Sequence, residues 1–243
     1  MIKRKQQQVS YLSGEAGFTI IESLVAILIV AILLAAIAPT IVIATATRVQ
    51  SKRVEQATQA ARSFIDGVKS GAVTTPATTI TLTQSAAATP RSLGDNLLTT
   101  TNMPVPATST SLTSLYCVTK DTNNNITIAN PDCTSNTNKI FYIQAVKIVV
   151  TGSNPTDTTT GLPKDGYRLG IRVYRSDIDI NKTVYASDSN NRKTQSTFTG
   201  TLGNSQSPLV EMTTEIGSRN TSFNALCQRL AITGSTTSNT TCN

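Results

Sequence analysis

The chain contains no histidine and no tryptophan, and aromatic residues make up 5% of its 243 residues. Without histidine, Ser-His-Asp and Cys-His catalysis are excluded, as are zinc sites built on imidazole. The sequence also lacks the glycine-rich loops that hold phosphates in nucleotide-binding proteins. We therefore expect that the protein is not an enzyme and that it holds no cofactor.

The excess of positive charge is modest. The chain has 21 Lys and Arg against 14 Asp and Glu, a net charge of +7, and no basic patch is interleaved with aromatic rings. Nucleic acid is therefore not an expected partner. Arg48, Lys52 and Arg53 lie close together in the sequence. They either contact lipid phosphates or a neighbouring protein, or form an ordinary solvated helix face.

A long apolar run near the N-terminus contains a single charge. Between Phe18 and Ala46 the only ionisable side chain is Glu22, and about 20 apolar residues suffice to span a bilayer. A charged side chain at the centre of a bilayer costs roughly 2.5–3.5 kcal/mol. Glu22 is therefore a functional candidate that needs a partner. We expect this partner to be a free amine, created by cleavage between Gly17 and Phe18.

Two simpler interpretations of this run remain. A secretory signal peptide would be cut after Ala36-Ile37-Ala38, but Pro39 follows that site at once and is a poor residue there. The second interpretation is a membrane anchor that is not cleaved. The positive residues that precede the run would then stay in the cytoplasm.

The segment Gly17-Phe18-Thr19-Ile20-Ile21-Glu22-Ser23-Leu24 resembles the cleavage and methylation segment of type IV prepilins and type II secretion pseudopilins. The resemblance implies cleavage after Gly17, N-methylation of Phe18, a role for Glu22 in filament assembly and a helix kink at Pro39. It also implies four kinds of partner: a prepilin peptidase, other pilins in a filament, an assembly platform with its ATPase, and the inner membrane.

Helix geometry agrees with this role of Glu22. On a helix that starts at Phe18, residue 22 lies one turn further on, on the same face as the N-terminal amine. Before assembly, Glu22 would interact with its own amine and with the positive end of the helix dipole. In a filament, the amine of an incoming subunit would pair with Glu22 of a neighbour.

The sequence predicts three parts: a leader over 1–17, a membrane or filament-core helix over 18–47, and a periplasmic globular domain over 48–243. We expect one helix from Phe18 to Ser70. Its second half carries an apolar stripe that packs on a sheet, and Gly71 caps its end. The stripe consists of Val54, Ala57, Ala61, Phe64 or Ile65, and Val68.

The expected fold class is α+β, with this helix packed on an antiparallel sheet of about four or five strands, as in pilins. A Thr- and Ser-rich connector over about 72–115, with a short strand at 79–83, leads to the sheet region over about 116–243. Alternating β-branched and aromatic residues predict strands at 139–151 and 167–175. In the second of these, Tyr167, Leu169, Ile171 and Val173 are expected on one face, and Arg168 and Arg172 on the other, polar face. Weaker strands are expected at 183–186, 195–202 and 209–215, and a helical turn or short strand at 225–232.

Four cysteines, Cys117, Cys133, Cys227 and Cys242, suggest two disulfides in an oxidising compartment. The sequence permits three ways of pairing them. Sequential pairing would close two short loops, each worth about 3 kcal/mol in the chain-entropy model. The pair Cys227 and Cys242 resembles the C-terminal disulfide loop of many pilins.

Two acidic turns have part of the spacing of a calcium loop. They are Asp177, Asp179, Asn181 and Asp188, and Asp121, Asn123, Asn125 and Asp132. Both lack the glycine and the final glutamate of an EF-hand. Ordinary turn chemistry, in which Asp and Asn are favoured, is the alternative.

We expect a minor pilin or pseudopilin of a type IV pilus or a type II secretion-like machine. The stretches 46–55 and 63–68 resemble pseudopilins of the cyanobacterial hormogonium polysaccharide secretion system, which implies polysaccharide secretion and gliding motility. The alternative is a ligand-binding minor pilin, which would act as a tip adhesin, in DNA uptake or in sugar binding.

Overall fold

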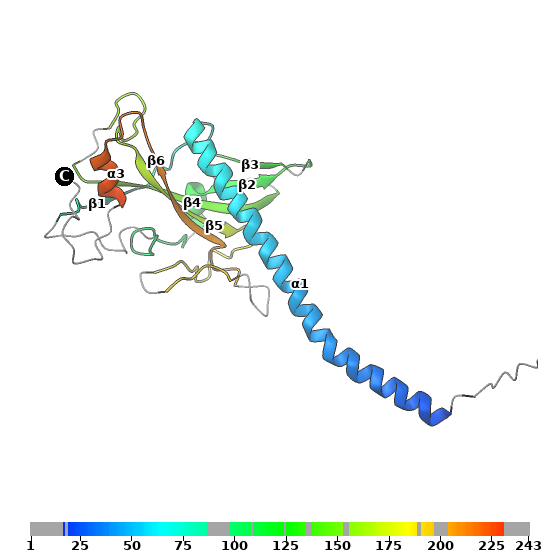
Figure 1. The fold of residues 1–243 in the computed structure, drawn as a ribbon. Coiled ribbons are helices and arrows are strands. Elements are labelled where there is room, and N and C mark those ends of the chain that lie inside the picture. The colour runs from blue at the N-terminus through cyan, green and yellow to red at the C-terminus, as the bar shows by residue number, and fades with distance from the viewer. Residues whose placement is uncertain are drawn as a thin grey trace, which may run out of the picture. The chain divides into compact units, whose positions relative to one another are not determined.

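The computed structural model describes residues 17, 19–86, 98–107, 109–123, 125–134, 138–152, 156–188, 191–196 and 204–230. Its internal contacts divide the chain into two units, Met1–Thr45 and Ala46–Asn243. Helix α1, Ile20–Ser70, contributes to both units and is continuous through Pro39 (Figure 1). The kink at Pro39 stays a prediction.

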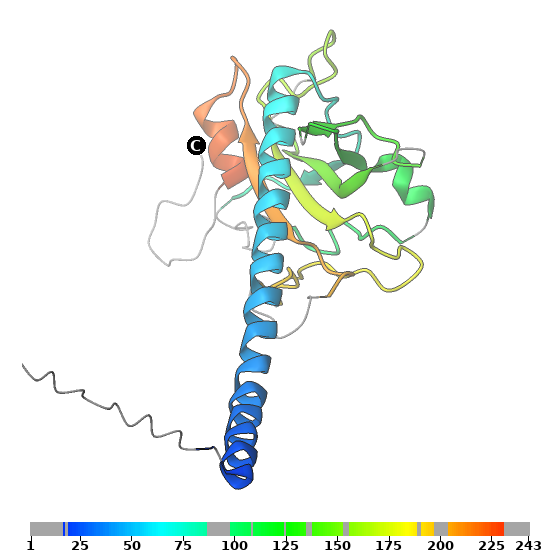
Figure 2. The ribbon, with the colours of Figure 1, turned by 90° about the vertical axis from the view of Figure 1, so that its right-hand side faces the viewer.

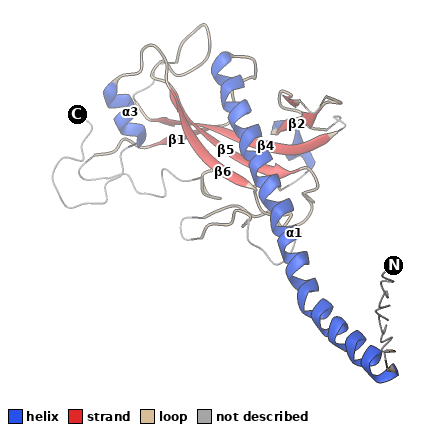
Figure 3. Ribbon diagram, turned by 45° about the vertical axis from the view of Figure 1, so that its right-hand side comes forward, coloured by secondary structure: helices blue, strands red, loops and turns tan. Residues whose placement is uncertain are grey.

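The second unit is built on one mixed sheet. The strands are β1 (Thr79–Leu82), β2 (Tyr116–Lys120), β3 (Ile126–Ile128), β4 (Lys139–Val150), β5 (Tyr167–Arg175) and β6 (Val210–Ile216). Their order is β3-β2-β4-β5-β6, with antiparallel pairing throughout, and β1 pairs with β4 in parallel. A 3₁₀ helix, η1 (Ser109–Ser114), precedes β2, and α3 (Phe223–Leu230) follows β6. The predicted α+β class, a long helix on a mainly antiparallel sheet, is confirmed (Figure 3).

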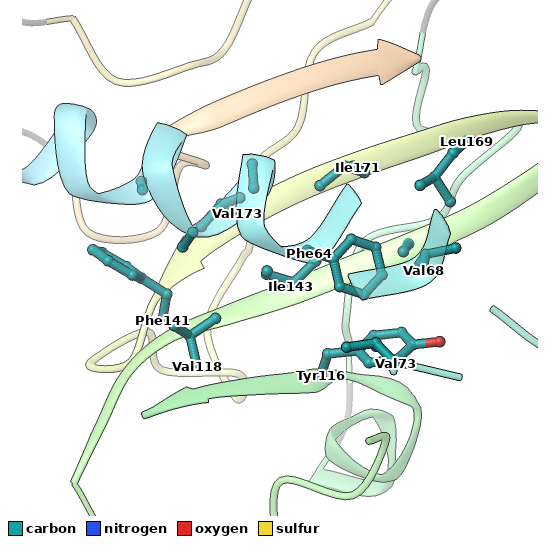
Figure 4. Close-up of a cluster of buried hydrophobic side chains, with 14 of the residues drawn as sticks. Phe64, Val68, Val73, Tyr116, Val118, Phe141, Ile143, Leu169, Ile171 and Val173 are labelled. Atoms are coloured by element: carbon teal, nitrogen blue, oxygen red, sulfur yellow. The ribbon is translucent and has the colours of Figure 1, made fainter. Parts of the chain in front are cut away.

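The second half of α1 lies against one face of this sheet (Figure 2), and its apolar stripe packs there. Ala57, Ala61 and Phe64 are fully buried, and Val68 is almost so. The ring of Phe64 meets that of Tyr116 edge-on, with centroids 4.7 Å apart (Figure 4). Side chains from alternate positions of β4 and β5 complete this core, namely Phe141, Ile143 and Ala145, and Tyr167, Leu169, Ile171 and Val173.

The helix ends where the sequence predicted. Gly71 follows Ser70 with φ of 77°, a left-handed conformation that glycine adopts without strain. The Val73 N–H then donates a hydrogen bond back to the Gly67 carbonyl at 3.0 Å, which turns the chain toward β1.

The strand predicted at 183–186 is wrong, because these residues are irregular. Of the strand predicted at 195–202, residues 195–196 are irregular and 197–202 lie outside the described residues. Tyr185 is held by a backbone hydrogen bond from its N–H to the Gln206 carbonyl at 2.9 Å, and its own carbonyl accepts from the Tyr174 hydroxyl at 3.3 Å. These isolated contacts satisfy the backbone without a ladder. The predicted element at 225–232 is helical, as α3.

The second face of the sheet is covered as well, by the connector after β1. Leu98 and Met103 pack there against Val146 and Ile148. Arg172 lies under this segment with no exposed surface. Its guanidinium donates to the carbonyls of Met103 and, at 3.1 Å, of Leu98, because a buried guanidinium needs every acceptor it can reach.

Helix α3 has an inverted arrangement of polar and apolar side chains. Its buried face carries Gln228 and Arg229, whereas Phe223 is 81% exposed and Leu230 is 41% exposed. Arg229 Nε lies 2.9 Å from Glu215 Oε2, and its Nη1 donates to the Asp165 carbonyl at 3.0 Å, while its Nη2 has no partner among the described residues. Hydrogen bonds, more than apolar contacts, therefore hold α3 in place.

Candidate functional site

The first turn of α1 is the candidate site, and Thr19 caps it. The Glu22 N–H lies 3.3 Å from Thr19 Oγ1 and 3.1 Å from the Thr19 carbonyl. Thr19 is thus the N-cap and Glu22 the third residue of the helix, the spacing of a capping box. The cap was missed in the sequence analysis, although the pattern Thr-x-x-Glu is its signature.

Glu22 is exposed in the first helical turn. A carboxylate at this place is favoured by the unpaired N–H groups and the positive end of the helix dipole. It is the only acidic residue of the first turn. Glu22 therefore presents a negative charge at the start of an apolar helix, where an amine can approach it.

Gly17 is exposed, and a Cβ atom added there would meet nothing within 4 Å. Phe18 and residues 1–16 lie outside the described residues, so cleavage, methylation and the leader stay predictions.

The helix that follows exposes apolar side chains all round. Among the described residues, one helix is long and apolar enough to cross a membrane, and it is α1. Leu24, Leu28, Ile32 and Ala35 line one shallow apolar groove along it. A helix that is apolar on every side is typical of a membrane span or of a helix buried among others.

The basic residues beyond this stretch differ in their surroundings. Arg48 and Lys52 are exposed, so they are free to contact other molecules. Arg53 is partly buried, and its Nη1 has no partner among the described residues. Near them, Gln50 is fully buried and donates from Nε2 to Gln195 Oε1 at 2.7 Å. Nothing in the sequence around Gln50 indicated this long-range contact.

The structure joins Cys117 on β2 to Cys133, with their Cα atoms 5.4 Å apart. Both residues are fully buried, so the predicted local disulfide is confirmed for this pair. Cys227 is also disulfide-bonded, while Cys242 lies outside the described residues.

The carboxylates of the two acidic turns bind their own loops. Asp121 accepts hydrogen bonds from the N–H groups of Asn123 at 2.8 Å and Asn125 at 2.7 Å, and the bonds from Asn125 are the main cause of its lowered pKa. Asp177 pairs with Arg175, and Asp179 lies 3.4 Å from Lys182. Within the described ranges no group of three or more metal-ligating side chains comes together.

The comparisons with known proteins identify the N-terminal segment. Residues 12–38 match the family model of the prokaryotic N-terminal methylation motif, which is the signature of type IV pilins and pseudopilins. The match includes Gly17, Phe18 and Glu22. No curated protein and no solved structure matches the chain.

Proposed function

We propose that this pilin-like chain is a minor pilin or pseudopilin, one subunit of a type IV pilus or of a type II secretion-like filament. The methylation motif implies processing by a prepilin peptidase and assembly with other pilins. The chain would be inserted in the inner membrane through α1, with the unit Ala46–Asn243 on the periplasmic side. An assembly platform and its ATPase would supply the mechanical work.

The observation that carries this proposal is the position of Glu22. It is an exposed carboxylate in the first turn of a helix whose next two dozen positions carry no other charge. Lipid or neighbouring helices would have to cover such a surface. The carboxylate would then be left in a low-dielectric environment unless an opposite charge reaches it.

Cleavage after Gly17 would supply that charge as the new N-terminal amine of Phe18. Two unit charges about 4 Å apart attract by about 1 kcal/mol in water and about 4 kcal/mol at an effective dielectric constant near 20. The larger value offsets a large part of the cost of burying the pair, which is roughly 2.5–3.5 kcal/mol for each charge placed in hydrocarbon. Pairing between neighbouring subunits would therefore set their register in a filament.

Mass spectrometry of the mature protein tests the processing step. We expect an N-terminus at Phe18 that carries one added methyl group. A mature chain that begins at any other residue would overturn the proposal, including one cut before Pro39 or one that keeps residues 1–17.

Filament incorporation of Glu22→Ala tests the assembly step, with Glu55→Ala as the matched control. Glu55 is an exposed glutamate on the same helix, outside the apolar stretch. We expect Glu22→Ala to be cleaved and stable in the membrane but absent from sheared filaments, and Glu55→Ala to assemble as the parent does. Normal incorporation of Glu22→Ala would refute the role of the carboxylate.

The finer function that we propose is support of polysaccharide secretion and gliding motility. It rests on the resemblance of the stretches 46–55 and 63–68 to hormogonium pseudopilins. A deletion strain is expected to lose both surface polysaccharide and gliding, and the wild-type chain should restore both. Normal secretion in the deletion strain would remove this part of the proposal and leave the filament role intact.

A further inference from the structure

A half-open cavity of about 260 Å³ lies where α1 ends, within the unit Ala46–Asn243. Three segments form its wall: the last turn of α1, the connection between β4 and β5, and the residues that follow β6. The end of α1 and the β4–β5 connection lie on the same side of the unit in two perpendicular views (Figures 1 and 2). Sites for drug-sized ligands measure about 300–1,000 Å³, so this cavity fits a single small unit.

The charge around the cavity is predominantly positive. Lys69, Lys164 and Arg219 line it, and Asp157 is the carboxylate among the lining residues. None of the three cations forms an ion pair with a carboxylate of the described residues.

Asp157 interacts with Lys164 but does not neutralise Lys69 or Arg219. Its Oδ1 accepts from the Thr160 N–H and the Thr159 N–H, each at 2.9 Å, and these bonds lower the pKa of the carboxyl, with a smaller contribution from Lys164. The carboxylate is therefore turned into its own loop. Lys69 and Arg219 keep their charge available to a ligand.

The wall of the cavity is held in place by hydrogen bonds. Ser218 Oγ donates to the Lys164 carbonyl, and Thr221 Oγ1 donates to the Asp165 carbonyl at 3.0 Å. Gly166, with φ of 76°, lets the two segments approach, because a Cβ atom there would lie 2.3 Å from the Ile216 carbonyl oxygen. A wall fixed in this way loses little conformational entropy when a ligand binds.

The hydroxyl of Tyr167 is a further polar group of the wall. Tyr167 lines the cavity and is 2% exposed as a whole residue, and its hydroxyl makes no hydrogen bond to the described residues. A hydroxyl without a protein partner can bond to water or to a ligand. The wall thus combines free cations, a free hydroxyl, and the apolar side chains of Leu162 and Pro163.

We propose that this cavity binds a carboxylated sugar unit, of the hexuronate class, within an acidic polysaccharide. The carboxylate would pair with Arg219 and Lys69, since guanidinium and ammonium groups bind carboxylates through short charge-assisted hydrogen bonds. The sugar hydroxyls would meet the hydroxyl and amide groups of the wall, and the apolar face of the ring would lie on Leu162. Binding of the sugar does not depend on filament assembly. A failure to bind it would therefore leave the proposed pilin function intact, and a failure to assemble would leave the proposed binding intact.

Saturation-transfer NMR with the full chain in non-ionic detergent micelles tests the proposal. The probe is galacturonate, compared with galactose, which lacks the carboxylate, and with acetate, which lacks the ring. We expect saturation of galacturonate that weakens as salt is added, little saturation of galactose, and no displacement by equimolar acetate. Equal signals from galactose, or displacement by acetate, would overturn the sugar-acid assignment.

Two variants place the binding in this cavity. Arg219→Gln and Lys69→Gln should each weaken galacturonate binding by about tenfold or more, as expected when a charged hydrogen bond is lost. Lys52→Gln, an exposed lysine of the same helix outside the cavity, should leave binding unchanged. An unchanged affinity in both cavity variants would refute the site. An unchanged near-UV circular dichroism spectrum confirms that each variant is folded. If Arg219→Gln does not fold, Lys69→Gln alone tests the site.

Discussion

Gln228 binds both backbone groups of Ser85: its Oε1 accepts from the Ser85 N–H at 2.8 Å, and its Nε2 donates to the Ser85 carbonyl at 3.3 Å. Both residues are buried. One side chain of α3 therefore fixes the chain just after β1, far away in sequence.

Replacing Gln228 by alanine would remove both of these bonds. A buried polar group left unsatisfied costs about 1–3 kcal/mol, so we expect Gln228→Ala to lower the free energy of unfolding by about that amount. Urea unfolding followed by near-UV circular dichroism measures it. Gln59→Ala, at an exposed position of α1, is the control and should change stability by less than about 0.5 kcal/mol. Equal effects of both changes would contradict the prediction.

Arg172 should be among the least replaceable side chains. Its Nε lies 2.9 Å from Glu211 Oε1, with the arginine side chain fully buried. Arg172→Leu would leave Glu211 without its cation and two carbonyls without a donor, at a cost of about 3–5 kcal/mol. Arg172→Lys should recover only part of this, because an ammonium cannot reproduce the guanidinium fork.

The control for Arg172→Leu is Arg175→Leu on the same strand. Arg175 pairs with Asp177, whose side chain is 56% exposed, and exposed pairs contribute at most about 1 kcal/mol. Denaturant midpoints of the two variants make the comparison. A smaller loss for Arg172→Leu than for Arg175→Leu would show that the buried ion pair is not important for stability.

Gly170 allows the connector to lie on the second face of the sheet. A Cβ atom there would lie 2.5 Å from Leu98 Cδ2 and 3.1 Å from Val146 Cγ2. We expect Gly170→Ala to destabilise the protein by about 1–3 kcal/mol through overpacking. Gly217→Ala is the control, since its Cβ would meet only Thr221 Oγ1 at 3.7 Å.

A double variant identifies the source of that strain. If Leu98 is the obstacle, Gly170→Ala combined with Leu98→Ala should cost less than the sum of the single changes. Additive losses would mean that the added methyl group disturbs β5 by another route. Thermal unfolding of the four proteins completes the cycle.

Stability should fall in alkali as the buried tyrosines ionise. Burial raises the pKa of Tyr116 to about 12 and, together with the nearby Tyr116, that of Tyr167 to about 12. An unfolded tyrosine titrates near about 10, so above that pH the unfolded chain binds fewer protons than the folded one. The contribution of the two neutral tyrosines to the free energy of unfolding is fully present below about pH 10 and is lost as the pH rises toward about 12.

Urea midpoints at pH 9 and pH 11 test this dependence. The parent protein should be less stable at the higher pH, and Tyr116→Phe should show a smaller loss between the two values, since it cannot ionise at that position. An identical loss in both proteins would mean that Tyr116 does not contribute to the alkaline transition.

The sequence predicted the elements whose pattern is local. The alternation in β5 put Leu169, Ile171 and Val173 on one face, and the spacing of Ala57, Ala61 and Phe64 gave the buried face of α1. These predictions are confirmed because the repeat of apolar residues, every second residue in a strand and every third or fourth in a helix, depends only on which side of that one element is buried.

What the sequence did not indicate depends on partners that are distant along the chain. The alternation placed Arg172 on the polar face of its strand, but the connector covers that face, and two of its carbonyls accept from the guanidinium. The parallel pairing of β1 with β4 and the bond between Gln50 and Gln195 are likewise long-range. The strand predicted at 183–186 was wrong because β-branched and aromatic residues fit other half-buried surfaces as well.

The cap at Thr19 has a consequence for maturation. A cut after Gly17 would release everything upstream and leave Phe18 as the sole residue ahead of the cap, while the bond from the Glu22 N–H to Thr19 Oγ1 lies wholly on the retained side. The peptidase would therefore alter the electrical charge at the helix tip without unwinding the helix. The precursor and the mature chain would have the same backbone conformation in this helix. The membrane-inserted precursor would therefore become competent for assembly without refolding in the bilayer.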